Sequence, residues 1–449
     1  MVTPTGWSER FGHHHLSSLL LAVAVGLYLL GGRLPAQDLD APRTLAELNT
    51  WYREPPTNQN AAVFFAPAFE AMNFAIRDWE SRDLPWVGTA ALSPLGSPLP
   101  AGMEQALAEL VQRNKSALDY FATARRCEHC RFPIDLSQCP DLPLPHLTKL
   151  HLASELLAID ALWQANAQEG AQAGRTLLTG FGLARSLDLE PVLVSQLIRV
   201  KCVKVAVGSL EQALNRAAIP LEGLDELQST VTQLCEHDAA GTGFRRGLAG
   251  TRLISAALFA MSPEKLERFL TDGGVLSEQA KDFLARLPGH SLVLEQQFMD
   301  ETYETLLRAW KESYPGRFDA VDRVCATRYS MAKTNQLLAR VFQIQELPRL
   351  AEKESYCLAL LRMAQAAVAL EHYRLAHRGV YPQFLSDLVP TCIAAIPNDP
   401  FDGRPLGYHR NGSGYALHGR SPGTARSLDR HADHAEGSTR FTVVSPGTK

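Results

Sequence analysis

The first hydrophobic pattern along the chain is an apolar segment near the N-terminus. Residues 11–32 contain no Asp, Glu, Lys or Arg, and Arg10 and Arg33 flank them. A charge-free segment of this length approaches the ~20 residues that a helix needs to cross a bilayer. We expect residues 1–36 to be a cleaved signal peptide or a retained membrane anchor, with the body of the chain outside the cytoplasm. A buried soluble helix is the remaining alternative, which the glycines and the proline-bearing linker that follow disfavour.

Beyond this segment, apolar residues follow helical spacing along most of the chain. Thr44, followed by Glu47 three residues later, predicts the capped start of a short helix. Prolines between residues 94 and 100 and between 133 and 145 predict loops. The clearest helical face has apolar residues at spacings of three and four. It consists of Leu152, Leu156, Ile159 and Trp163.

These patterns predict a mainly α-helical protein. We expect an N-terminal membrane helix, stacked helical hairpins and a small C-terminal α+β module with a short antiparallel sheet. The membrane segment comes first, and a helical region with proline-rich loops, a helical-hairpin domain, the α+β module and a polar tail follow in that order. The boundaries are 1–36, 37–146, 147–346, 347–420 and 421–449.

Composition changes this picture little. The chain has 449 residues, of which 46% are hydrophobic and 20% charged, which is ordinary for a globular protein with sizeable cores. The formal net charge is -4, from 44 basic and 48 acidic residues. This balance argues against nucleic acid as a partner, because a phosphate-binding surface needs clustered positive charge.

The module at residues 347–420 contains the most specific motif. A long helix is predicted over residues 352–378, and Gly379 follows it, where a left-handed residue commonly ends a helix. Strands are predicted at 406–409 and 414–417. Asp402-Gly403 is a hairpin signal for which these are the flanking strands, and Asn411-Gly412 predicts a second turn. The motif residues are Gly379, Tyr381, Pro382, Asp399, Pro400, Phe401 and Gly403.

This order of elements resembles the globular domain of type II secretion major pseudopilins. In that family a long helix ends in a similar Gly-x-Tyr-Pro turn and packs on a small antiparallel sheet. The same residues, with the stretches 130–135 and 144–147, are similar to uncharacterised envelope proteins of planctomycete-like and verrucomicrobia-like bacteria. The chain lacks the prepilin cleavage motif, and residues 418–426 contain no acidic residue to match the family's calcium loop. We therefore expect neither a pilin subunit nor a calcium site.

Three cysteines cluster in the second proline-rich loop. Cys127 and Cys130 form a Cys-x-x-Cys motif and Cys139 follows; such a motif suggests zinc or redox chemistry. In an exported domain a disulfide is more natural, so we expect Cys130 to pair with Cys127 or Cys139. Unpaired thiols are one alternative. The other is a metal site formed by the three cysteines with His129 or His146.

No catalytic motif is present. The chain has no Gly-x-Ser-x-Gly and no His-Glu-x-x-His sequence, and the glycine-rich residues 241–247 lack the strand and the lysine of a phosphate loop. We interpret His431 and His434 as part of the polar tail, and we expect no cofactor. A set of carboxylates at 295–304 is interpreted as a solvated helix face. These are Glu295, Asp300, Glu301 and Glu304.

These observations favour a membrane-anchored, extracytoplasmic interaction or scaffold protein. Its expected partners are the membrane, through residues 11–32, and other envelope proteins or peptides, because helical stacks commonly bind such partners along one face. Two alternatives remain open. One is an envelope enzyme of unrecognised class, and the other is an accessory component of a secretion or pilus-like assembly.

Overall fold

The computed structural model describes residues 42–139, 142–262, 264–266, 268, 292–334, 347–420 and 439–444. Over these residues the chain is mainly helical and has one small three-stranded antiparallel sheet, which confirms the coarse prediction. The expected membrane segment at 1–36 and the two tail histidines lie outside the described residues. None of the helices within the described ranges combines the length and the apolar character that crossing a membrane requires.

Short elements form the N-terminal region. They are α2 (Leu45–Trp51), η2 (Thr57–Gln59), α3 (Ala62–Ala71), α4 (Asp78–Asp83), α5 (Ala101–Arg113), α6 (Lys115–Ala124) and η3 (Leu136–Gln138). Thr44 is the N-cap of α2, as predicted, and its hydroxyl accepts a hydrogen bond from the backbone N–H of Glu47 at 3.1 Å.

Long helices form the body of the molecule. They are α7 (Pro145–Asn166), α8 (Gly170–Arg185), α9 (Leu193–Leu214), α10 (Leu221–Ala239), α11 (Thr242–Phe259), α14 (Leu292–Ala309), α15 (Gly316–Thr334) and α16 (Leu347–Ala376). α7 packs against α8, α9 and α5, and α9 also contacts α11 and α16. Both α7 and α9 are buried on nearly every side, so the predicted single face of α7 is only part of its buried surface.

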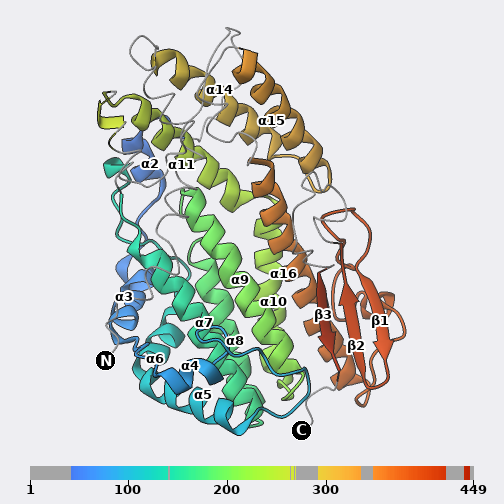
Figure 1. Ribbon diagram of the computed structural model, residues 1–449. Helices are drawn as coiled ribbons and strands as arrows, with labels where there is room; N and C mark the ends of the chain where they lie inside the picture. Colours follow the sequence, from blue (N-terminus) through green and yellow to red (C-terminus); the bar gives the residue numbers. More distant parts are fainter. Residues whose placement is uncertain are drawn as a thin grey trace.

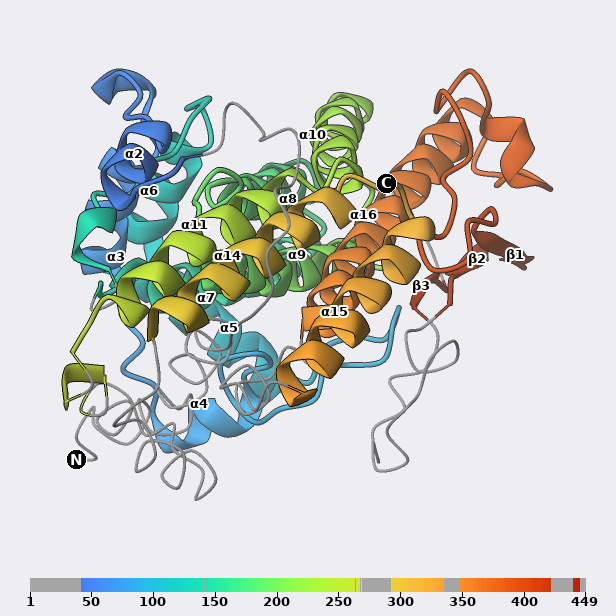
Figure 2. The ribbon, with the colours of Figure 1, turned by 90° about the horizontal axis from the view of Figure 1, so that it is seen from above.

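The C-terminal module lies beside α16. It contains η6 (Leu385–Leu388), β1 (Gly407–Asn411), β2 (Gly414–His418) and β3 (Arg440–Val443), with the strands in the order β1-β2-β3. β2 and β3 contact α16. Figures 1 and 2 show the sheet on one side of the helical body and α2, α3 and α6 on the opposite side.

The third strand corrects the sequence analysis, which assigned residues 421–449 to a polar tail. Phe441 and Val443 are buried and pair in register with Leu417 and Tyr415 of β2. Thr442 lies between them with its side chain on the opposite face, so the segment has the period of two that a half-buried strand requires. Four residues are too few for this period to stand out in a polar stretch.

The hairpin turn also differs from the expectation. Asn411 pairs with Gly414, so Gly412 and Ser413 close the hairpin between β1 and β2. Asp402-Gly403 makes a separate turn before the sheet, in which the Gly403 N–H donates to the Asp399 carbonyl at 2.8 Å. Both glycines have positive φ, +58° and +72°, so each signal predicted a real turn but only the second joins the strands.

Candidate functional site

The Cys-x-x-Cys loop borders a small cavity of about 180 Å³. Side chains from α3, α6, α8 and α10 complete its wall. The polar residues that line it are Arg125, Glu128, His129, Thr179, Arg185, Ser186, Asp188 and His237. The Cys-x-x-Cys motif identified this loop from the sequence. No sequence motif identified Asp188 and His237 as cavity residues, because the packing of the helices brings them to this loop.

The thiols of this loop are held in their protonated form. Burial raises the pKa of Cys127, and burial together with the nearby Glu190 raises that of Cys130. Burial also raises the pKa of Cys139, to about 12. Since the thiolate is the form that attacks substrates and binds metals, this environment disfavours both roles. All three residues are free thiols in the structure, and the disulfide of Cys130 with Cys127 or Cys139 stays a prediction.

The alternative metal site does not assemble. Across the described ranges, no three His, Cys, Asp or Glu side chains are grouped so that they could hold a metal ion. His129 and the three cysteines therefore do not form such a set. His146 instead faces a buried carboxylate, with its Nε2 3.0 Å from Glu190 Oε1, and its ring stacks on Phe132 at 4.3 Å.

Glu190 is the centre of a buried hydrogen-bond cluster. Besides His146, the Ser195 hydroxyl donates to Glu190 Oε1 at 2.5 Å, and the Tyr52 hydroxyl donates to Oε2 at 3.3 Å. These donors come from the residue that ends α2, the start of α7 and the start of α9. The carboxylate therefore joins three segments, and its buried oxygens are hydrogen-bonded to polar partners.

A buried arginine joins the cavity wall to the core. Arg199 on α9 is fully buried, and its guanidinium pairs with Asp188 and, at 2.7 Å, with Asp238 of α10. His237 Nδ1 lies 3.9 Å from Asp188 Oδ2, which is too long for a hydrogen bond. Burial lowers the pKa of His237, so this imidazole is neutral at pH 7. Its Nε2 makes no hydrogen bond to a described residue.

This arrangement provides one element of acid–base chemistry. A neutral imidazole that lines a cavity can accept a proton from a bound group. However, Asp188 is engaged by Arg199 rather than by His237, and the nearby thiols of Cys127 and Cys130 are protonated. The described residues of the cavity therefore offer a base without an activated nucleophile.

A second buried carboxylate anchors the far end of the body. Glu354 on α16 accepts hydrogen bonds at one oxygen from Trp310 Nε1 at 2.9 Å, Tyr314 hydroxyl at 2.8 Å and Arg317 Nη1 at 2.6 Å. Arg317 also donates to the carbonyl of Ala239 at the end of α10. Burial raises the pKa of Glu354, and Arg317 opposes that shift. This cluster ties α14 and α15 to α10 and α16.

The interpretation of the α14 carboxylates as a solvated face is correct only in part, because three of them are partly exposed and one is buried. They are Glu295, Asp300, Glu301 and Glu304. Glu295 is fully buried. Arg252 of α11 lies 3.3 Å from Asp300 and 3.1 Å from Glu304, and Arg328 of α15 lies 3.1 Å from Glu301. Asp300, Glu301 and Glu304 face arginines on neighbouring helices, which the pattern of a single helix cannot show.

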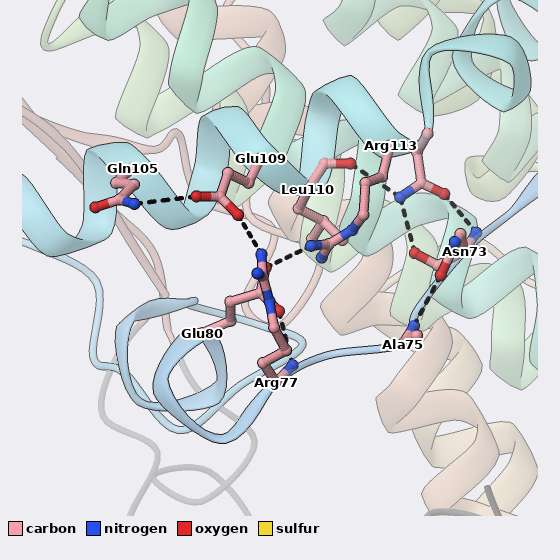
Figure 3. A network of polar contacts seen from close by, with 9 residues as sticks. Asn73, Ala75, Arg77, Glu80, Gln105, Glu109, Leu110 and Arg113 are labelled. Carbon is pink, nitrogen blue, oxygen red and sulfur yellow. Dashed lines mark hydrogen bonds and ion pairs between the residues drawn. The ribbon is translucent and has the colours of Figure 1, made fainter. Parts of the chain in front are cut away.

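A polar network fixes α4 against α5 (Figure 3). Glu80 is fully buried, and its Oε1 lies 3.0 Å from Arg77 Nη2 and 2.5 Å from Arg113 Nη1. Burial favours the protonated acid, but the two arginines outweigh it and lower the pKa of Glu80 to about 2. At the break between α5 and α6, the buried Asn114 accepts from the Asn73 N–H at 2.7 Å and donates to the Asn73 carbonyl at 3.0 Å. These contacts are structural.

The C-terminal motif residues shape the module. Gly379 has φ +86°, the left-handed conformation predicted at the end of the long helix. Tyr381 is buried, and its hydroxyl donates to Glu371 of α16 at 2.5 Å. The carbonyl of the buried Pro382 accepts from the Tyr408 hydroxyl at 2.8 Å. The turn after α16 is thus fixed to both the helix and β1.

Asp399 organises the following turn. Its carboxylate accepts from the Phe401 N–H at 2.8 Å and from the Arg420 N–H at 2.5 Å, and the neighbouring Pro400 is buried. The Phe401 ring stacks on Phe318 of α15 at 5.7 Å. The motif therefore serves the architecture, because its backbone bonds shape the loop and its aromatic ring docks the module on the body.

Two larger hollows lie near the end of α16. The first, of about 830 Å³, is lined mainly by apolar residues of the α9–α10 connection and α16, including the exposed Leu221 and also Leu375. The second, of about 620 Å³, lies between η6 and β1 and includes Phe384, which is 63% exposed. Exposed apolar side chains of this kind often mark surfaces that bind other proteins.

The fold and these sites define a helical protein with a small α+β module, whose deeply buried charges are compensated mainly by one another. Comparisons with known protein families, with curated proteins and with solved structures found no match for this chain. The resemblance to pseudopilins and to bacterial envelope proteins therefore stays a prediction.

Proposed function

We propose that this chain is a membrane-anchored interaction or scaffold protein of the cell envelope, with its body outside the cytoplasm. The charge-free residues 11–32 support the anchor. The helical body, interpreted as stacked helical hairpins with α7, α8 and α9 packed on one another, supports a rigid platform.

The lining of the two hollows favours a binding function over a catalytic one. The hollow of about 830 Å³ is lined largely by apolar side chains, and the hollow of about 620 Å³ combines apolar and polar side chains; Leu221 and Phe384 are exposed beside them. In contrast, the buried carboxylates Glu190, Glu354 and Asp238 are held by core partners. A surface that offers apolar anchors and few reactive groups is suited to binding a protein or peptide.

The test uses the full-length chain in native cells. A photo-crosslinking amino acid replaces Leu221, and a matched control carries it at Tyr120, an exposed position on α6. We expect the chain in the membrane fraction, cleavage by externally added protease, and discrete crosslinked species from position 221 but not from 120. A chain found in the soluble cytoplasmic fraction, or equal crosslinking from both positions, would contradict the proposal.

One observation favours the enzyme alternative, namely the cavity that brings His237 close to the Cys-x-x-Cys loop. The rate of labelling by iodoacetamide distinguishes an enzyme from a binding protein, because an activated thiol reacts faster than free cysteine at pH 7. With raised thiol pKa values, we expect Cys127 and Cys130 to react more slowly than free cysteine. If these cysteines react faster than free cysteine, and a His237→Gln variant reacts more slowly than the native chain, the result would favour the enzyme alternative.

A further inference from the structure

The two edges of the sheet are treated differently by the rest of the molecule. At the β3 edge, side chains of α9 satisfy the outward backbone groups. Glu211 accepts from the Thr442 N–H at 2.6 Å, and Asn215 donates to the Thr442 carbonyl at 2.8 Å and accepts from the Val444 N–H at 2.7 Å. Because a helix occupies this edge, no further strand can add there.

Among the described residues, no strand or helix covers the outer edge of β1. Asn411 and Gly414 flank a two-residue turn and exchange hydrogen bonds, and in an antiparallel ladder such pairs alternate. The backbone groups of His409 therefore face β2, whereas those of Tyr408 and Arg410 face outward. Within the described part of the chain, no hydrogen bond reaches these outward groups. Figure 1 shows β1 as the outermost strand, with β3 nearest the helices.

The hollow of about 620 Å³ runs along this open edge. Tyr408, His409 and Arg410 all line it, although successive strand residues point to opposite faces of a sheet. A hollow that contacts three successive residues must therefore lie beside the strand rather than on one face. Its opposite wall includes Phe384 and Leu385, which supply an apolar surface next to the unpaired backbone.

The edge is also held rigid. The Tyr408 hydroxyl donates to the Pro382 carbonyl at 2.8 Å, and Arg410 Nη1 donates to the Tyr381 carbonyl at 3.2 Å. These bonds fix β1 to the turn after α16, so an added strand would meet a preformed surface. Arg410 and His409 line the hollow, and the nearby Asp387 carboxylate already accepts a hydrogen bond from the Phe384 N–H at 3.0 Å. Arg410 therefore supplies a positive charge that complements an acidic partner.

We infer that the β1 edge and its hollow bind an extended acidic–apolar peptide segment of another protein, which adds as a fourth strand. Backbone hydrogen bonds to Tyr408 and Arg410 supply affinity, an apolar side chain of the peptide packs against Phe384, and a carboxylate faces Arg410. This inference rests on the proposed function and names the class of partner for it.

The probe is a short fluorescein-labelled peptide that alternates glutamate with phenylalanine and valine, added to the full-length chain in detergent. The control is an N-methylated copy of the peptide, with methyl groups on alternate backbone nitrogens. It keeps the side chains but loses the backbone N–H groups that would donate hydrogen bonds to β1. Saturable binding of the first peptide is expected in fluorescence anisotropy. Equal binding of the methylated copy would overturn strand addition.

Two variants at one position separate backbone from charge. Arg410→Pro removes an outward N–H that does not bond to β2, a position where an edge strand tolerates proline. Arg410→Ala keeps that N–H and removes the charge. We expect about a tenfold loss of affinity or more for the proline variant and a smaller loss for the alanine variant. Helical circular dichroism of both variants serves as the control for folding.

Two other results are informative. Sedimentation without peptide tests edge-to-edge pairing of two copies. A dimer that is lost in the proline variant would overturn the inference of a peptide partner, because the partner at this edge would then be a second copy of this chain. If the peptide does not bind while position 221 still crosslinks in membranes, the β1 inference fails and the proposed function stands. If crosslinking at 221 also fails, the proposed function fails with it.

Discussion

The buried charges are the residues on which stability depends most directly. Arg199 is fully buried between Asp188 and Asp238, and Glu354 is buried among Trp310 and Arg317. Removing one member of such a group leaves an uncompensated charge in a medium that solvates it poorly. The residue scale is therefore where single substitutions should have their largest effects.

We predict that Arg199→Met lowers the free energy of unfolding by about 3–5 kcal/mol, because it leaves two buried carboxylates without their cation. Urea unfolding followed by circular dichroism measures the change. Arg53→Met, at an exposed position, serves as the matched control and should change stability by about 0.5 kcal/mol or less.

Neutralising the two acids in the same chain tests the cause. A triple variant that combines Arg199→Met with Asp188→Asn and Asp238→Asn removes the unpaired charges. It should recover part of the lost stability, since burying a neutral amide costs less free energy than burying an unpaired charge. A triple variant no more stable than the single one would contradict this account.

At the scale of elements, α9 is both a core helix and the cover of the β3 edge. Burial raises the pKa of Glu211 to about 7. A carboxyl whose pKa is raised on folding contributes stability that is complete below its unfolded pKa and is lost as pH rises through the folded value. The protein should therefore lose this contribution between about pH 4.5 and pH 7.

The variant Glu211→Gln keeps an acceptor for the Thr442 N–H but does not titrate. We predict that the stability of the native chain relative to this variant decreases as pH rises from 5 to 8. Urea unfolding at both pH values measures the difference. Glu222→Gln, at an exposed position of α10, is the control, and a difference that increases with pH would refute the assignment.

The third strand gives a second prediction for the elements. Phe441 is buried against β2 and α16, so Phe441→Ala should cost about 3–5 kcal/mol. The neighbouring Arg440 is exposed, and Arg440→Ala should change little. If residues 440–443 were only a polar tail, both variants would behave alike in thermal unfolding.

At the scale of the whole molecule, α16 belongs to both parts. It packs on α9, α10 and α15 in the body and on β2 and β3 in the module. Phe401 adds a stack on Phe318. Because these contacts are shared, we predict that body and module unfold in one cooperative transition rather than as separate domains.

Hydrogen exchange with mass spectrometry measures this coupling. As low concentrations of denaturant are added, the free energy of the opening that exposes the β2 amides should become equal to that for the α9 amides. Exchange of the β2 amides at a much lower free energy, with α9 still protected, would show that the module opens independently.

The sequence by itself determined the features whose cause is local. Helical spacing identified the long helices, Thr44 identified a cap, and Gly379 identified the end of α16, because each depends on residues within one or two turns. The charge-free residues 11–32 also depend only on their own composition. These signals fix which segments are helices and where several of them end.

Only the tertiary structure decided which residues meet. Arg199 and Asp188 are 11 residues apart, Arg317 and Glu354 are 37 apart, and Asn215 reaches Thr442 across 227 residues. No period within one element encodes such pairs, since they depend on which helices pack side by side. The ion pairs of the α14 acids, the recruitment of β3 and the open edge of β1 follow from that packing alone.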